Sequence, residues 1–192
     1  MEVEDIKSRL KAKLNKSRYE HTIRVYEEAT ALAEKYEADQ EEVMIAALFH
    51  DYYKNTSKEE LKQLLIHYGL PESLLQYHAE LWHGPVAAEF LKQEMKIGNL
   101  DIYKAIYYHT TGRAKMSLVE QIVFIADYIE PARSFPGVSH VRKLAYQNLD
   151  EAVYESLKLT IQYLNEKKAI IHPSTKDAFE YYKSLIRGES DE

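Results

Sequence analysis

The residues with the clearest potential for chemistry are His50 and Asp51, which are adjacent at the end of an apolar run that begins at Ala46. A carboxylate is costly to bury without a partner, so a metal ion that binds both side chains is the hypothesis that this pair raises. Lys54 follows closely, and on a continuing helix its ammonium would lie where a metal-bound phosphate oxygen would sit. The alternative is a solvated His-Asp pair at a helix end.

Two further inward-facing groups stand on other predicted helices. His21 shares one helical stripe with Val25, Ala29 and Leu32, and Asp127 lies inside the most apolar segment of the chain. A lone core histidine usually makes hydrogen bonds to its neighbours, so His21 alone is weak evidence for a metal site. Asp127 has fewer structural explanations, because buried charged residues are normally paired or bound to metal.

Together, His21, His50, Asp51 and Asp127 would supply two nitrogens and two oxygens. This mixed set suits iron, manganese, cobalt or zinc better than calcium or magnesium, and octahedral iron or manganese better than closed tetrahedral zinc. Open positions would accept a water and a phosphate oxygen, and a metal-bound hydroxide would then be the nucleophile. The residues therefore predict a hydrolase.

The pattern of apolar residues and caps predicts one all-α domain spanning residues 1–192. Ser17, Asp39, Ser57 and Ser117 each precede a glutamate by three positions, which is typical of helix N-termini. His83 precedes Gly84-Pro85 at another helix start, which favours anions. The expected helices are 1–14, 17–36, 39 to the His50-Asp51 pair, 57–69, 71–83, 85–91, 99–109, 117–129, 139–147, 150–166 and 176–186, with 170–175 as a loop.

Composition narrows the classes of function. The 192-residue chain is 45% hydrophobic, has no cysteine and carries a formal net charge of -6. Thiolate metal sites are excluded, nucleic acid is disfavoured as a partner, and a polyanionic substrate would need local cations. No apolar run approaches the roughly 18 residues that span a membrane, so we expect a cytoplasmic protein without membrane contact.

The series His21, His50-Asp51, Asp127 resembles the H…HD…D signature of the HD superfamily of metal-dependent phosphohydrolases, which are all-helical. Closer similarity is to its YqeK type, a bacterial bis(5'-nucleosyl)-tetraphosphatase that cleaves symmetrically. The segments that carry this resemblance cover most of the chain and are Arg18-Tyr19-Glu20-His21-Thr22, Ala47-Leu48-Phe49-His50-Asp51-Tyr52-Tyr53-Lys54, His83-Gly84-Pro85-Val86-Ala87-Ala88, Tyr108-His109-Thr110-Thr111-Gly112-Arg113 and Ile125-Ala126-Asp127-Tyr128-Ile129-Glu130-Pro131-Ala132-Arg133.

The resemblance implies an HD-domain fold with a metal-site region at about 17–133 and C-terminal helices, 139–187, that complete a nucleotide pocket. It implies that His21, His50, Asp51 and Asp127 hold iron, with a second ion held through His83 and His109, or with these two donating hydrogen bonds to phosphate instead. Asp51, Lys54, His83 and His109 would be catalytic. Besides these catalytic and metal-binding groups, the residues that it places at a dinucleoside polyphosphate or nucleoside diphosphate are Arg18, Thr110, Arg133, Ile170, Ile171, His172, Pro173, Ser174 and Thr175.

The function expected from all this is symmetrical hydrolysis of diadenosine tetraphosphate to two ADP. The first alternative is another HD phosphohydrolase acting on nucleoside mono-, di- or triphosphates. The second is a non-catalytic nucleotide-binding module, and the third is a purely structural helical protein, which leaves Asp127 unexplained. His67, His78 and His140 are interpreted as structural or exposed. The oligomeric state stays open, a homodimer included.

Overall fold

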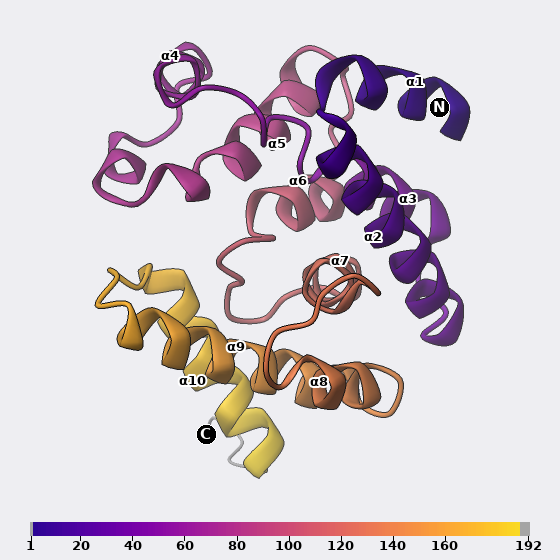
Figure 1. Cartoon of the computed structure of the whole chain (residues 1–192), viewed down its shortest axis with the longest axis vertical. Coiled ribbons are helices and arrows are strands. Elements are labelled where there is room, and N and C mark those ends of the chain that lie inside the picture. The colour runs from indigo at the N-terminus through magenta and orange to yellow at the C-terminus, as the bar shows by residue number, and fades with distance from the viewer. Residues whose placement is uncertain (1, 189–192) are drawn as a thin grey trace.

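The structure, a computed structural model, describes residues 2–188, and within them it is entirely helical, as the sequence predicts (Figure 1). The all-α fold class is therefore confirmed. The elements are α1 (Val3–Lys13), α2 (Lys16–Lys35), α3 (Gln40–Phe49), α4 (Lys58–His67), the 3-10 helices η1 (Glu72–Gln76) and η2 (Ala79–Leu81), α5 (His83–Gln93), α6 (Leu100–Tyr107), α7 (Leu118–Ile129), α8 (Val138–Ala145), α9 (Leu149–Glu166) and α10 (Pro173–Arg187).

Helix α7 forms the centre of the molecule, seen end-on in Figure 1. It packs against α2, α3 and α6 on one side and against α8 and α9 on the other. Its sequence explains this place, because Ile122, Val123, Ile125 and Ala126 are all fully buried, so both faces of the helix need a partner. Because Asp127 lies on this helix, its side chain is placed near the middle of the fold.

The predicted caps hold at three of four helices. The side chains of Asp39 and Ser57 accept hydrogen bonds from the backbone N–H of the glutamate three positions on, and Ser117 with Glu120 forms a full capping box. The prediction for Ser17 was wrong. Asn15 caps α2 instead: its side-chain oxygen accepts a hydrogen bond from Arg18 N, and Ser17 lies within the first turn of the helix.

Three chain breaks differ from the expected helices. In place of the expected helix 71–83 the structure has two short 3-10 helices, η1 and η2, and α5 begins at His83. Helix α3 ends at Phe49, so His50 is its C-cap and Asp51 and Lys54 lie in the turns that follow, not on a continuing helix. The last helix begins three residues earlier than expected, because Pro173 occupies its first position, where a missing N–H costs nothing. Residues 170–172 are a connection, as predicted, but 173–175 are helical.

Close packing of α5 on α6 depends on Gly84. A Cβ built there would lie 2.9 Å from the carbonyl oxygen of Ile106 and 3.0 Å from Nδ1 of His109. Only glycine therefore allows the start of α5, with His83, to approach the end of α6, with His109.

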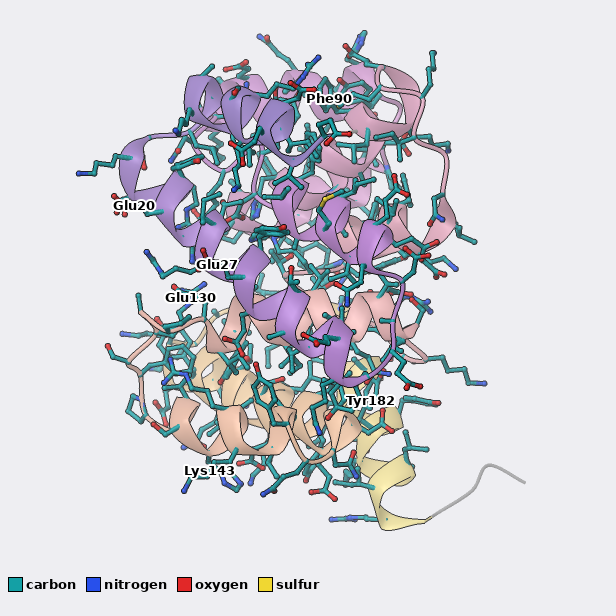
Figure 2. The ribbon with its side chains drawn as sticks, turned by 90° about the vertical axis from the view of Figure 1, so that its right-hand side faces the viewer. Glu20, Glu27, Phe90, Glu130, Lys143 and Tyr182 are labelled. Atoms are coloured by element: carbon teal, nitrogen blue, oxygen red, sulfur yellow. The ribbon has the colours of Figure 1, made fainter. Side chains whose placement is uncertain are left out.

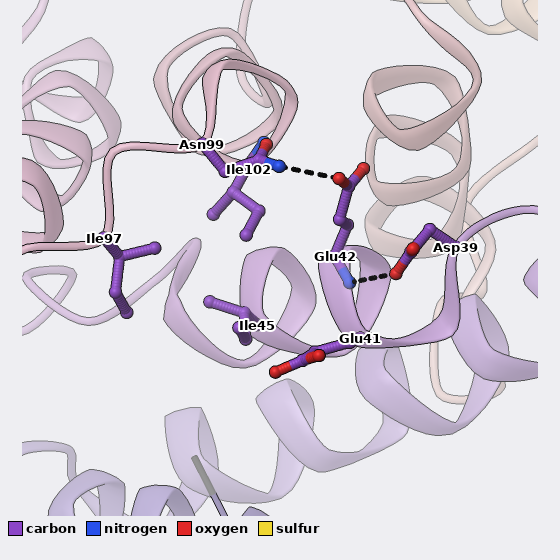
Figure 3. A pocket seen from close by; sticks show the side chains of 7 residues that line it. All are labelled: Asp39, Glu41, Glu42, Ile45, Ile97, Asn99 and Ile102. Atoms are coloured by element: carbon purple, nitrogen blue, oxygen red, sulfur yellow. Dashed lines mark hydrogen bonds between the residues drawn. The ribbon is translucent and has the colours of Figure 1, made fainter.

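A separate hollow lies at the start of α3, away from the His50-Asp51 turn (Figure 3). Here Glu42 accepts a hydrogen bond from the side chain of Asn99, while its backbone N–H is bound by Asp39. Since Asn99 also caps α6, these contacts join the N-termini of α3 and α6. We assign this region a structural role.

Arg142 on α8 holds the end of α7 and the loop after it. Its guanidinium donates to the carbonyl oxygens of Ile129 (2.8 Å), Glu130 (2.9 Å) and Arg133 (2.6 Å). Carbonyls at a helix end have no partner within the helix, so this side chain satisfies groups that would otherwise need water.

We expect Arg142→Met to destabilise the protein by about 2 kcal/mol, the range for removing charge-assisted hydrogen bonds from partly buried carbonyls. Denaturant unfolding monitored by circular dichroism measures the loss. The matched control is Lys143→Met at the neighbouring exposed position. Equal stability of the two variants would contradict the anchoring role.

Candidate metal centre

The predicted ligands come together from three elements: His21 from α2, His50 and Asp51 from the end of α3, and Asp127 from α7. His21 Nε2 lies 3.0 Å from Asp127 Oδ1 and 3.5 Å from Asp51 Oδ2. His50 Nε2 lies 3.4 Å from Asp51 Oδ2 and 3.9 Å from Asp127 Oδ1. Three of the side chains are buried, and that of Asp127 is 20% exposed, so it is less buried than the sequence predicted.

Hydrogen bonds at Nδ1, the ring nitrogen that faces away from the cluster, orient the imidazoles of His21 and His50. His21 Nδ1–H donates to Glu130 Oε1 (3.1 Å) and His50 Nδ1–H to the Ala47 carbonyl oxygen (2.6 Å). Both Nε2 lone pairs therefore point into the cluster, where these buried atoms make no hydrogen bond. Metal-binding histidines typically donate their other ring N–H to a carboxylate or carbonyl in this way.

These residues fit a bound divalent ion. Neighbouring ligands of one ion, bound at about 2.1 Å, lie roughly 3.0 Å apart in octahedral and 3.4 Å apart in tetrahedral geometry. Three of the four nitrogen-to-oxygen separations above are 3.0 to 3.5 Å. The two imidazole nitrogens without hydrogen bonds and the two carboxylates beside them could thus all bind one cation.

A second pair of histidines lies on the other side of Asp51. His83 Nε2 is 3.0 Å from Asp51 Oδ1 and 3.0 Å from His109 Nε2, and His109 Nδ1–H donates to the Ile106 carbonyl oxygen. Burial lowers the pKa of His83 to about 4, so its imidazole is neutral at pH 7. Asp51 thus presents one oxygen to each histidine pair, and His50, Asp51 and His109 form a second group that could hold an ion.

The two aspartates are ionised. Burial by itself would raise the pKa of Asp51, but His50, His109 and His83 hold it well below its usual value. The pKa of Asp127 is likewise lowered, because its contact with His21 and its proximity to His50 outweigh desolvation. Negative charge therefore stays at the centre of the cluster across the neutral pH range.

Three predicted phosphate-binding cations lie at the rim of this cluster, each paired with a carboxylate. Arg18 Nη1 donates to Asp51 Oδ2 (2.8 Å), and Arg133 Nη2 donates to Asp127 Oδ1 (3.0 Å). Lys54 is paired with Glu80 on η2.

The segment 170–175 is only partly at the site. His172 and Ser174 line a hollow of about 160 Å³ together with Thr110, Tyr107, Tyr108 and Pro85. The hydroxyl of Thr110 is buried without a hydrogen-bond partner, and the ring of Tyr77 lies 4.5 Å from that of His172.

The other members of the segment do not line this hollow. Ile170 is 73% exposed, Pro173 is exposed and Ile171 half-buried, and Thr175 is turned to the Thr111 carbonyl, to which its hydroxyl donates. The three histidines that were not assigned to the site are exposed, as expected: His67, His78 and His140.

Sequence reasoning missed Glu130 and Arg24. Glu130 is buried, lies beside α2 in Figure 2, and joins His21 to the guanidinium of Arg24, whose Nε is 2.7 Å from Glu130 Oε2. A signal was present, because Glu130 follows Asp127 by three positions and Arg24 follows His21 by three, and such pairs share a helix face. Glu80, the partner of Lys54, had no such signal.

Comparison with known proteins agrees with this geometry. A sequence model of the HD domain family matches residues 18–132. The chain is 44% identical to a symmetrical bis(5'-nucleosyl)-tetraphosphatase of Bacillus subtilis (strain 168), over 93% of this chain and 95% of that protein. It is 40% identical to one of Staphylococcus aureus (strain NCTC 8325 / PS 47), over 95% of each.

A crystal structure described as a predicted HD superfamily hydrolase involved in NAD metabolism from Clostridium acetobutylicum superposes with a TM-score of 0.90 at 35% identity, covering 96% of this chain and 98% of that one. The fold and the candidate metal centre thus agree with the family match, and the chain is an HD-domain protein. Within that family, the chain belongs with the symmetrical bis(5'-nucleosyl)-tetraphosphatases, which confirms the resemblance seen in the sequence.

Proposed function

We propose that this protein is a metal-dependent hydrolase that cleaves dinucleoside tetraphosphates at the central anhydride, giving two nucleoside diphosphates. The names of its relatives support this substrate class. The observation that carries the chemistry is the pair of buried, unbonded Nε2 atoms of His21 and His50, which face two ionised carboxylates.

His21, His50, Asp51 and Asp127 would hold the ion. Their mixed nitrogen and oxygen donors suit iron, manganese, cobalt or zinc better than calcium or magnesium, and the family resemblance favours iron among these. When bound, such an ion lowers the pKa of a water and polarises a phosphoryl oxygen. A second ion could bind through His109, the far oxygen of Asp51 and His83; without it, the neutral His83 would donate a hydrogen bond to phosphate.

The remaining residues would bind and orient the substrate. Arg18, Lys54 and Arg133 surround the cluster and would neutralise charge on the phosphates, because phosphoryl transfer depends mainly on positioning and electrostatics. For Lys54 this requires release from Glu80, whose side chain is exposed enough to leave. The hollow at Thr110, His172 and Ser174 would hold one nucleoside, and the buried Thr110 hydroxyl supplies a free polar group there.

Several expectations from the sequence stay predictions. They are the cytoplasmic location, the homodimer, and the division into a metal-site region at 17–133 and C-terminal helices at 139–187 that complete the nucleotide pocket. None of the described helices has the length and apolar character of a membrane span.

The competing function is hydrolysis of nucleoside mono-, di- or triphosphates with the same ion. A nucleotide-binding module without turnover is the alternative of another class.

We expect Asp127→Ala to lower metal affinity at least about 100-fold while helical circular dichroism is unchanged. Groups that only hydrogen-bond to a metal ligand change metal affinity about 10- to 100-fold, and Asp127 would be a direct ligand. Elemental analysis of the purified variant measures the loss. The control is Asp5→Ala, an exposed aspartate on α1. Full metal content and full activity in Asp127→Ala would remove it from the ligand set.

We expect Lys54→Met to keep its metal and to lose roughly 100-fold in kcat/KM, the scale of deleting one group that stabilises charge in the transition state. A protonated lysine should not ligate a metal ion. Metal content therefore distinguishes a role of Lys54 in contacting phosphate from a role in holding the metal site together. Lys62→Met on the exposed face of α4 is the control. A variant that loses metal and keeps its rate per bound ion would show that the role of Lys54 is structural.

The function itself is tested by the products. Hydrolysis of diadenosine tetraphosphate by the iron-loaded protein should give only ADP at early times, because the ion would face the second phosphorus of a held ADP half. ADP should then inhibit competitively. Chromatography of a nucleotide panel decides: equal ATP and AMP would refute symmetrical cleavage, and faster turnover of a mononucleotide would favour the competing function.

A further inference from the structure

A second binding site for a nucleoside is suggested by an aromatic groove between α9 and the loop that follows α7. The groove has a volume of about 590 Å³ and is larger than the hollow at Thr110. The residues that line this aromatic groove are Tyr128, Phe135, Pro136, Leu159, Thr160, Gln162, Tyr163 and Glu166.

The groove begins at residues that neighbour the candidate metal centre along the chain. Tyr128 directly follows Asp127, so their Cα atoms are about 3.8 Å apart. Phe135 lies two residues after Arg133, whose guanidinium binds Asp127. The groove thus begins next to Asp127 and Arg133 along the chain, and a phosphate chain that passes these two residues would lead toward it.

The walls of the groove have the chemistry of a base-binding site. The rings of Tyr128 and Phe135 meet edge to face at 4.9 Å, and Tyr163 stands on α9 with 57% of its surface exposed. Phe135 is also exposed, at 37%. Exposed aromatic rings add little to a fold but offer stacking surfaces to a purine. Polar side chains lie beside them, among them Gln162, which donates a hydrogen bond to Glu166.

The groove is held in place rather than adaptable. Arg142 fixes the backbone at the start of the loop, and Gly137 at its end packs so closely on α9 that a Cβ there would lie 2.7 Å from Leu159 Cδ1. A preformed site loses less free energy on ordering when it binds a ligand.

We propose that the aromatic groove binds the second nucleoside of the dinucleoside substrate, the half that does not occupy the hollow at Thr110, His172 and Ser174. The inference rests on the proposed function. It explains how a site could select a substrate with nucleosides at both ends over a mononucleotide, because only the former fills both the hollow and the groove.

The test compares Tyr163→Ala with wild type, using diadenosine tetraphosphate turnover and ADP binding by calorimetry, both with metal-loaded protein. The variant should lose at least about five-fold in kcat/KM, mainly through KM, which is the lower range of stacking one base on an aromatic ring. ADP, with one nucleoside, should bind the hollow in both proteins with affinities within two-fold. Phe135→Ala should behave as Tyr163→Ala does, and Tyr163→Phe, which keeps the ring, should behave as wild type.

Tyr146→Ala, an exposed tyrosine at the end of α8 outside the groove, is the matched control and should keep full turnover. If both Tyr163→Ala and Phe135→Ala turn over the substrate as wild type does, the nucleoside-binding role of the groove is refuted and the proposed function is not. If the wild-type protein is inactive on diadenosine tetraphosphate, both the proposed function and the role of the groove are refuted. An equal loss of ADP affinity would show that the groove holds the first nucleoside. A dimer that dissociates in Tyr163→Ala, seen by light scattering, would show that the groove binds a second copy of the chain.

Discussion

The Asp51 carboxylate is the group on which the arrangement of the site depends. It is buried at the meeting point of α3, α5 and α6, and its two oxygens face different histidine pairs. Desolvation opposes its charge, so the fold surrounds it with His50, His83 and His109 and a guanidinium from α2. Removing any one of these neighbours leaves buried charge less compensated, which couples the geometry of the site to the stability of the core.

Backbone carbonyls at helix ends are what make this cluster specific. His50 and His109 each follow a helix and donate Nδ1–H to a carbonyl three residues earlier, Ala47 and Ile106. The last carbonyls of a helix lack internal partners, so an imidazole placed there satisfies one and is oriented by it. Ending α3 and α6 at these residues is therefore a requirement of the site, and Gly84 lets the two ends lie within reach of one another.

Local signals predicted most of the fold and the residues that meet at the candidate metal centre, and long-range contacts account for what was missed. Caps at Asp39, Ser57 and Ser117 lie within four residues of the groups they bind, so sequence reveals them. Local spacing places Glu130 near Asp127 and Arg24 near His21, but the pairing of Glu130 with Arg24 spans 106 residues and depends on how α7 crosses α2. The error at α2 had another cause, since Asn15 and Ser17 are both competent caps and only the path of the chain chooses between them.

Charge at the site explains how a protein with a net charge of -6 could bind a polyanion. Arg18 and Arg133 are held by Asp51 and Asp127, through the same carboxylate oxygens that face His21 and His50. An ion bound between these oxygens and imidazoles would compete with the two guanidinium groups for the carboxylates. The guanidinium groups would then be freer to contact phosphate, so in the proposed function metal binding and substrate binding favour each other, and attraction for the substrate arises locally, where the reaction would take place.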